Sequence, residues 1–400
     1  MEIVVLTYNE ALDAILRHAR SLKPKTLSLT ECLGLTLAKD LQSPEPFPSF
    51  DNSAVDGYAV ALKEEKTKEQ IKLKVQGEIR AGEHLRKSLK PGRAVRIFTG
   101  APIPPGTQAV VMQEHTERVN GSILLHKSPS PGDNIRYRGE DFLKGRVLAR
   151  KGTTLGPAHL AVLTAVGYKK AAVYPAPTVG ILATGSELLG KGEKLRPGKI
   201  RDSNSVLLES LVKQAGGIPS PLKMVGDEPK EILSCVRRGL KNDLLVISGG
   251  VSVGKYDFVK EALRREGVKE IFWKVDIKPG KPLFFGRKGG MLVFGLPGNP
   301  VSVFVTFEEF VKPALLQMRC QRKKAPAPVS GYLTERFKNG SRLHFVRVRC
   351  LPKKGKLAVI PLKGQGSHMI GELASANGLL RVEPDALLKR NERVFVKLIG

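Results

Sequence analysis

Residues 243–257 read DLLVISGGVSVGKYD, and this stretch decides the fold class. The apolar run at 243–248 predicts a buried strand, two glycines follow it directly, and the amphipathic segment 257–267 predicts a helix. A glycine-rich loop between a strand and a helix exposes backbone N–H groups that can bind phosphate. The stretch therefore predicts a strand–loop–helix unit of an α/β sheet, with an anion-binding loop after the strand.

The loop matches a nucleoside-triphosphate loop only in part. Gly249 and Gly254-Lys255 satisfy the first seven positions of G-x-x-x-x-G-K, but Tyr256 stands where a Ser or Thr should help to hold Mg²⁺. Asp257 adds negative charge where a γ-phosphate would lie. An acid at this point could hold Mg²⁺ or orient a water molecule, or it could only cap the helix. The pattern argues against an ATP site and leaves these interpretations of Asp257 open.

Strand and helix patterns alternate outward from this unit over about 150 residues. Apolar runs predict strands at 178–183, 223–225, 270–277, 283–286 and 291–296. Helical patterns occupy 205–215, 228–242 and 301–318, and the first of these follows the cap-type residues 202–204. Such alternation predicts an α/β multidomain protein built on a doubly wound, mainly parallel sheet.

The two flanks of this region have a different pattern. Residues 44–60 (PEPFPSFDNSAVDGYAV) are rich in proline and turns, and short β-type runs follow at 71–79, 93–100 and 108–114. A short helix is expected at 155–167. Residues 330–400 again show short β-type runs between turns, which suggests a small β-barrel.

Five glycine-, proline- or acid-containing loops follow predicted strands. In a doubly wound sheet the ligand binds beyond the carboxyl ends of the strands, so we expect these loops to share one edge. The loops are Thr184-Gly185, Gly226-Asp227, Ser248-Gly249-Gly250, the basic turn KPGKP at 278–282, and LPGNP at 296–300.

Acidic and basic side chains gather on these loops. Any one of Glu187, Asp227 and Asp257 could simply cap a helix or face solvent, but the set suggests a Mg²⁺ site beside a phosphate. Lys274, Lys278 and Lys281 surround a stiff turn and could anchor phosphate or another oxyanion. Unaided, these residues support a metal-assisted reaction at phosphorus.

Composition limits the class of protein. The formal net charge of +28 favours anionic ligands, but aromatic residues make up only 6% and no nucleic-acid-binding motif is present. A generally basic surface is the simpler interpretation. The four cysteines form no CxxC pair, so the sequence predicts neither a thiolate metal site nor a disulfide framework. With no signal-peptide pattern or long apolar run, a cytoplasmic location is the default expectation.

Seven motifs, in order and spacing, resemble the molybdopterin molybdotransferase family, the molybdenum-insertion enzymes related to the E domain of gephyrin. They are PSFDNSAVDGYAV, FTGAPIPPG, ATGSEL, SGGVSVGKYD, IKPGKP, GLPGNPVS and GQGSHMIGELASANGLL, and they cover essentially the whole chain. The resemblance implies an enzyme that takes adenylated molybdopterin, cleaves its pyrophosphate with Mg²⁺, releases AMP and inserts molybdenum from molybdate.

The resemblance also implies a homodimer with four domains and an active site between the subunits. The expected domains are a molybdopterin-binding α/β domain (1–24 plus 172–320), an extended linker domain (25–46 plus 144–171), a β-rich domain carrying DNSAVDGYAV (47–143), and a C-terminal β-barrel (321–400).

Carried over motif by motif, the resemblance implies roles for individual residues. The implied catalytic residues are Asp56, Thr99, Asp141, Glu187, Asp227 and Asp257, of which Glu187, Asp227 and Asp257 would hold the metal. The implied substrate-binding residues are Thr184, Gly185, Ser248, Gly249, Gly250, Ser252, Pro297, Gly298, Asn299 and Pro300. Lys274, Lys278, Lys281, Arg347 and Ser367 would bind molybdate or phosphate.

Two alternatives remain at this point. One is a molybdopterin adenylyltransferase-like enzyme, which would share the α/β domain and use ATP, although it lacks the extra domains. The other is a scaffold or nucleic-acid-associated protein that has kept the fold, which the charge of +28 suggests.

Overall fold

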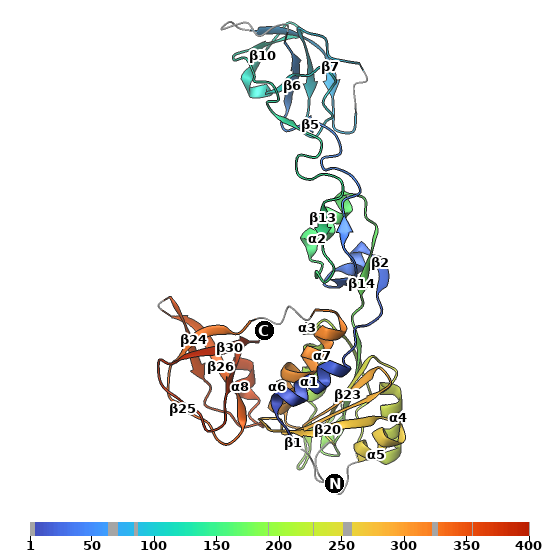
Figure 1. The fold of residues 1–400 in the computed structure, drawn as a ribbon, viewed down its shortest axis with the longest axis vertical. Helices are drawn as coiled ribbons and strands as arrows, with labels where there is room; N and C mark the ends of the chain where they lie inside the picture. Colours follow the sequence, from blue (N-terminus) through green and yellow to red (C-terminus); the bar gives the residue numbers. More distant parts are fainter. Residues whose placement is uncertain are drawn as a thin grey trace. The chain divides into compact units, whose positions relative to one another are not determined.

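The computed structural model describes residues 5–62, 71–83, 87–190, 192–226, 228–250, 258–321, 327–353 and 355–399. The chain divides into two compact units (Figure 1). Unit 1 comprises Met1–Leu27, Cys32–Ala38 and Ala172–Gly400, and unit 2 comprises Ser28–Glu31 and Lys39–Ala171.

A seven-stranded sheet forms the centre of unit 1, in the order β1-β20-β22-β23-β19-β15-β18. Only β22 runs against its neighbours, so the prediction of a mainly parallel sheet is confirmed. Strand β22 follows β20 after a connection that is too short for a parallel crossover, so the two strands pair antiparallel. The strands are β1 (Val5–Leu6), β20 (Lys269–Val275), β22 (Pro282–Lys288), β23 (Met291–Leu296), β19 (Leu244–Ser248), β15 (Thr178–Ala183) and β18 (Ile218–Pro221).

Helices cover both faces of this sheet. One face packs on α1 (Tyr8–His18), α3 (Asn204–Gln214), α6 (Pro300–Thr306), the π-helix η3 (Phe307–Val311) and α7 (Lys312–Met318). The other packs on α4 (Pro229–Gly239) and α5 (Phe258–Arg265). Along β19, Val246 faces the first core and Ile247 the second. Burial on both faces explains why this strand is an unbroken apolar run in the sequence.

The prediction of a strand at 223–225 is wrong. The chain instead forms β18 at Ile218–Pro221, which pairs with β15, and Val225 makes only an isolated bridge with Thr184. The segment IPSP contains two prolines and so does not look like a strand in the sequence. It lies at the edge of the sheet, where a strand tolerates prolines because one side of it has no ladder to complete.

The C-terminal part of unit 1 is a closed five-stranded barrel, as predicted. The strands are β24 (Val329–Leu333), β26 (Leu343–Lys353), β27 (Lys356–Pro361), β28 (Gly378–Val382) and β30 (Arg393–Leu398), and the pairing of β26 with β28 closes the ring. The short strand β21 (Ile277–Lys278) from the α/β region pairs with the start of β26. This pairing attaches the KPGKP turn directly to the barrel.

Unit 2 contains a six-stranded sheet in the order β10-β11-β7-β8-β6-β9, which confirms the β-rich prediction. Its strands are β6 (Gly57–Ala61), β7 (Ile71–Ile79), β8 (Arg93–Ile97), β9 (Ala109–Met112), β10 (Thr116–Val119) and β11 (Ser122–Leu125). Separate apolar clusters cover its two faces. The expected short helix is α2 (Pro157–Ala165).

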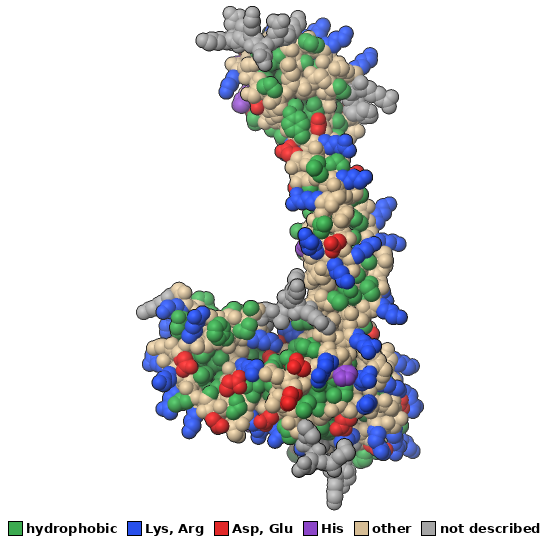
Figure 2. Space-filling view, viewed as in Figure 1, with side chains coloured by type: hydrophobic (Ala, Val, Ile, Leu, Met, Phe, Trp, Pro, Cys, Tyr) green, Lys and Arg blue, Asp and Glu red, His purple; other side chains and the backbone are tan. Residues whose placement is uncertain are grey.

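The surface shows no single basic patch on the visible face. Figure 2 shows Lys and Arg side chains spread over both units, with acidic side chains between them. Within the described ranges, none of the helices has the length and apolar character needed to cross a membrane. The division into four domains at the expected boundaries remains a prediction.

Candidate functional site

The site begins at the point where the strand order of the α/β sheet reverses. Strand β15 pairs with β18 on one side and with β19 on the other, so the connections leaving β15 and β18 run to opposite sides. A crevice opens at such a point beyond the carboxyl ends of the strands. Thr184 follows β15 and Ser248 ends β19, so two of the predicted loops lie at this crevice.

These two loops are in close backbone contact. The Thr184 N–H donates to the Ser248 carbonyl at 2.9 Å. A Cβ atom on Gly249 would lie 2.2 Å from the Thr184 carbonyl oxygen, and Gly249 has a φ of +86°. A Cβ atom on Gly250 would lie 2.7 Å from the Thr184 hydroxyl. Only glycine allows the loops to approach this closely, so the Ser248-Gly249-Gly250 sequence is a requirement of the packing.

The floor of the crevice carries a buried hydroxyl without a partner. Thr184 is 3% exposed and Ser248 is 2% exposed. Among the residues that the structure describes, no group hydrogen-bonds the Thr184 Oγ1 atom. Buried polar atoms are nearly always satisfied, by protein, water or ligand. A buried hydroxyl without a partner at the switch point fits a site for a polar ligand.

Of the three predicted metal ligands, the structure describes one. Glu187 is exposed just beyond β15, and its carboxylate lies over Gly185, where an added Cβ would be 2.6 Å from Oε2. Asp227 and Asp257 lie outside the described residues, as does the predicted substrate-binding residue Ser252. In the described part of the chain, no three acidic, His or Cys side chains form a group that could hold a metal ion.

Asn204 joins the loop after β19 to the loop after β23. Its Nδ2 atom donates to the Ser248 hydroxyl at 2.9 Å and to the Gly298 carbonyl at 2.7 Å. The sequence pattern placed Asn204 among the capping residues of the following helix, and this is wrong for its side chain. Asp202 does cap the turn, accepting from Ser205 N–H at 3.0 Å, whereas Asn204 is already inside α3.

The LPGNP loop also reaches the barrel. The Asn299 Nδ2 atom donates to the Ser367 hydroxyl at 3.0 Å, which joins two of the predicted motifs. Arg347 of β26 lies next to this point, since its Nη2 atom donates to the carbonyls of Gly364 and Gly366. The loops of the sheet and the loop of the barrel therefore form one continuous polar region within unit 1.

Arg347 has the properties of an anion-binding residue. The residue is 1% exposed, and burial lowers the pKa of its guanidinium. Its Nη1 atom has no hydrogen-bond partner, and no ion pair joins it to a carboxylate within the described ranges. The charge of Glu372 offsets part of this effect of burial on the pKa, but a buried cation without a direct ion-pair partner is costly. An oxyanion would complete both its charge and its hydrogen bonds.

His344 lies beside this corner and was not predicted from the sequence. It pairs with Lys278 across β21 and β26 and is 3% exposed. Burial is the main cause that lowers the pKa of His344 to about 4, and the positive charges of Lys278 and Arg347 contribute to this shift. Because both cations act on His344, the side chains of His344, Lys278 and Arg347 share one positively charged region. In the sequence, a single histidine within the β-type run of β26 does not indicate a role in this region.

The hydrogen bonds of His344 define its tautomer. The Asn339 amide donates through Nδ2 to three backbone carbonyls, so its Oδ1 atom is the acceptor for His344 Nδ1 at 3.2 Å. His344 is therefore neutral with its proton on Nδ1. Its Nε2 atom is an unpartnered acceptor within the described structure.

The other predicted lysines flank the same turn. Lys274 lies in β20 opposite Val5, and the carbonyl of Lys281 accepts from Val275 N–H at 3.0 Å. The turn itself packs on α6, because a Cβ on Gly280 would lie 2.5 Å from Thr306. The KPGKP turn is thus held between α6 and the barrel.

Three predicted residues lie in unit 2. Asp56 accepts hydrogen bonds from Thr99 N–H at 2.8 Å and Thr99 Oγ1 at 2.7 Å. These two bonds, the backbone one first, lower the pKa of the Asp56 carboxyl. Asp141 lines a cavity of about 620 Å³ together with Phe50, Arg136 and Gly100, the residue after Thr99. The structure therefore brings Asp56 and Thr99 into contact and places Asp141 on a neighbouring hollow.

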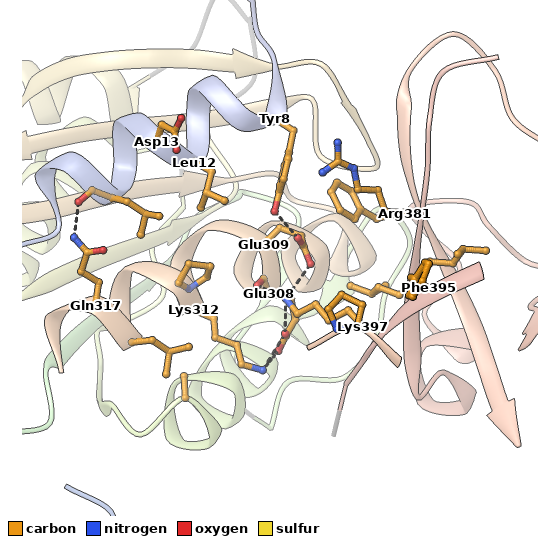
Figure 3. A pocket seen from close by; sticks show the side chains of 18 of the residues that line it. Tyr8, Leu12, Asp13, Glu308, Glu309, Lys312, Gln317, Arg381, Phe395 and Lys397 are labelled. Carbon is orange, nitrogen blue, oxygen red and sulfur yellow. Dashed lines mark hydrogen bonds and ion pairs between the residues drawn. The ribbon is translucent and has the colours of Figure 1, made fainter. Parts of the chain in front are cut away.

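A larger cavity, of about 1740 Å³, lies between α1, η3, α7 and barrel strands β28 and β30 (Figure 3). None of the predicted site residues lines it. Figure 3 shows an ionic network on its wall, in which the Tyr8 hydroxyl donates to Glu309 at 2.9 Å and Lys397 Nζ lies 2.9 Å from Glu309. Burial and the Glu309 charge raise the pKa of Tyr8. This network joins α1 and η3 to the barrel.

The comparisons with known proteins follow the same division of the chain. Residues 6–167 match the family model described as MoeA N-terminal region (domain I and II), and residues 180–317 match the probable molybdopterin binding domain. Residues 330–399 match the MoeA C-terminal region (domain IV). Together with the switch-point site, these matches define the class of the protein as an enzyme of molybdenum cofactor biosynthesis.

Individual relatives narrow this class. The chain is 37% identical to the molybdopterin molybdenumtransferase of Haemophilus influenzae over 364 residues, which span 90% of this chain and 89% of that protein. It is 35% identical to the enzyme of the same name from Bacillus subtilis, over 93% of this chain and 89% of that protein. The chain belongs to the molybdopterin molybdenumtransferase (MoeA) family, as the motifs predicted.

A solved structure supports the fold over the whole chain. The molybdopterin biosynthesis MoeA protein of Pyrococcus horikoshii is 32% identical, with a TM-score of 0.82, and the match covers 99% of this chain and 100% of that chain.

Proposed function

We propose that this chain transfers molybdenum from molybdate to adenylated molybdopterin. Water attacks at phosphorus, the pyrophosphate bond of the adenylated substrate breaks, and AMP leaves as molybdenum is inserted. One observation carries the proposal: the hydrogen bond from Asn299 to Ser367 joins the switch-point loops to the corner of Arg347 and Lys278. A binding site for a phosphorylated organic ligand and one for an oxyanion are therefore adjacent in unit 1.

In this proposal the two halves of the polar region have different ligands. Thr184, Gly185, Ser248-Gly249-Gly250 and the 297–300 loop bind the molybdopterin substrate. Lys274, Lys278, Lys281, Arg347 and Ser367 bind molybdate or phosphate. One buried polar atom in each half supports this assignment, because neither has a hydrogen-bond partner among the described residues. These atoms are the Thr184 hydroxyl oxygen in the first half and the Nη1 atom of Arg347 in the second.

A divalent cation, Mg²⁺ by preference, belongs to the same proposal. Glu187, Asp227 and Asp257 would hold it, and carboxylate oxygens are the ligands that Mg²⁺ prefers. When bound, it would supply Lewis-acid stabilisation of the charge that develops on the phosphates. The exposed carboxylate of Glu187, directly beyond β15, fits this role.

The acids of unit 2 belong to the proposal as well. Asp56 stays ionised because Thr99 donates two hydrogen bonds to it, and Asp141 lines the cavity beside Thr99. We assign these three residues to the catalytic set. Homodimeric assembly and a cytoplasmic location complete the proposal, and light scattering of the purified chain tests the assembly.

The reaction itself is tested with adenylated molybdopterin, Mg²⁺ and molybdate. We expect AMP release that requires molybdate, and loss of this release on chelation of the divalent cation. Consumption of ATP with free molybdopterin, without molybdate-dependent AMP release, would instead identify an adenylyltransferase. Tight, salt-sensitive binding of nucleic acid with no AMP release would identify the scaffold alternative.

A further inference from the structure

Asn204 is a residue whose side chain contacts both the loop after β19 and the loop after β23. Its side chain lies at the start of α3, and both loops reach it: Ser248 at the end of β19 and Gly298 after β23. The backbones of the two loops also meet, because the Gly249 N–H donates to the Leu296 carbonyl at 3.3 Å. We propose that Asn204 is a positioning residue for the molybdopterin site, an inference that rests on the proposed function.

The donor chemistry of the amide supports this role. The Nδ2 group has two hydrogens, and the Gly298 carbonyl can only accept. This acceptor sets the orientation of the amide, so the second hydrogen goes to the Ser248 oxygen at 2.9 Å. With its oxygen occupied by that donor, the Ser248 hydroxyl is free to donate its own hydrogen. Asn204 thereby presents Ser248 as a hydrogen-bond donor to an acceptor atom of the substrate.

The remaining atom of the amide supports a ligand at this point. Asn204 Oδ1 is buried and has no partner among the described residues. The Oγ1 atom of Thr184, whose N–H donates to the Ser248 carbonyl, is in the same state. Two residues that hydrogen-bond Ser248 therefore each carry a buried polar atom without a partner among the described residues, which exceeds what a purely structural contact would leave.

The hydrogen bond to the Gly298 carbonyl also affects the contact between this loop and the barrel. Gly298 is followed directly by Asn299, whose side chain donates to Ser367 of the barrel. Holding Gly298 therefore also holds the residue that touches the oxyanion corner. Asn204 sets the spacing between the loop that binds the organic substrate and the loop that reaches the barrel.

The test compares Asn204→Ala, the isosteric Asn204→Asp, Ser248→Ala and the double variant Asn204→Ala/Ser248→Ala. An aspartate at 204 cannot donate to either acceptor, and it would accept the Ser248 hydrogen instead. We expect each single variant to raise the KM for adenylated molybdopterin about tenfold, which is about 1.4 kcal/mol, with kcat changed much less. We expect the double variant to be no worse than the poorer single variant.

Asn242→Ala is the matched control, because it removes an amide hydrogen bond to the Gly239 carbonyl at the other end of β19. It should leave KM unchanged. Unchanged KM in folded Asn204→Asp, or additive effects in the double variant, would overturn the inference. Asn204→Asp retains the volume of the side chain, so it stays informative if the alanine variant does not fold. Absence of AMP release from the wild-type chain would refute the proposed function instead.

Discussion

The side chain of Asn299 donates a hydrogen bond of 3.0 Å to the hydroxyl of Ser367. The two residues are far apart in the sequence: one opens α6 in the α/β region, and the other belongs to a loop of the C-terminal barrel. Their contact places the buried Arg347 beside the carboxyl edge of the sheet, through the carbonyls of Gly364 and Gly366. The predictions below begin from this joined region.

Arg347 should determine affinity for molybdate. Arg347→Lys retains the charge but loses the planar fork, so we expect the Kd for molybdate to rise at least about tenfold. Isothermal titration with molybdate measures this. Arg349→Met removes an exposed cation two residues further along the same strand and should leave the Kd unchanged. Equal affinities of the Arg347 variant and the wild type would rule out this role.

His344 should make the free energy of unfolding depend on pH. The pKa of His344 is lowered from 6.5 to about 4 in the folded chain, so the unfolded chain takes up a proton at higher pH. The contribution of neutral His344 to the free energy of unfolding is complete above pH 6.5 and is lost as the pH falls toward about 4. The slope within this window is at most about 1.4 kcal/mol per pH unit.

This dependence can be measured by thermal melting between about pH 7 and about pH 5. His344→Gln does not titrate, so its melting temperature should fall less with acidity than that of the wild type. The exposed His368 lies in the same barrel, and His368→Gln should follow the wild type. Identical slopes for His344→Gln and the wild type would contradict the prediction.

Lys397 should stabilise the contact between the barrel and the α/β region. Its Nζ atom donates to the Glu308 carbonyl at 2.7 Å and to Glu309 Oε1 at 2.9 Å. Pro313 has no N–H group, so one carbonyl of the preceding turn lacks a helical donor, and Lys397 supplies one. Lys397→Met leaves two buried carboxylates with less countercharge, and we expect a loss of about 2 kcal/mol.

Thermal melting and limited proteolysis measure this loss. The control is Lys389→Met, which removes an exposed lysine of the barrel. We expect the control to melt like the wild type. A Lys397 variant with unchanged melting would mean that the network adds nothing to stability.

Gly249 should be irreplaceable. Its φ is +86°, and a Cβ would lie 2.2 Å from the Thr184 carbonyl oxygen, so Gly249→Ala must move one of the two loops. The strain of the backbone conformation alone is about 1–3 kcal/mol. We expect binding of molybdopterin, measured by equilibrium titration, to be lost. Gly290→Ala has no atom within 4 Å of the added Cβ and is the control that should bind normally.

Asp56 should be required for turnover and not for folding. Asp56→Asn keeps an oxygen that can accept from Thr99 but removes the charge, so we expect AMP release to fall at least about tenfold with melting unchanged. Thr99→Val removes one of the two donors that lower the pKa of Asp56. The acid limb of the pH–rate profile should therefore move to higher pH.

The control for Asp56 is Asp133→Asn, because Asp133 also accepts a backbone N–H in a loop of unit 2, from Ser130 at 2.8 Å. Full activity of the Asp56 variant, with the acid limb unmoved in the Thr99 variant, would exclude a catalytic role.

The sequence by itself determined the fold class and the position of the loops. Strand β19 is buried on both faces, so positions 244–247 are all apolar, and such a run is visible without a structure. The two glycines at its end reflect local backbone requirements, and these are visible too. The edge strand β18 was missed because exposure at the edge permits Pro219 and Pro221, which a central strand would exclude.

Only the tertiary structure decided which polar side chains act together. Asn204 resembles a cap in the sequence, yet its amide joins Ser248 to Gly298 across the sheet. The pKa of His344 is lowered first by its burial and then by the charge of Lys278, which lies on another strand. Hydrogen bonds and charges act over a few ångströms in space regardless of separation along the chain. A local pattern can therefore indicate where a loop lies, while its partners depend on how distant segments pack.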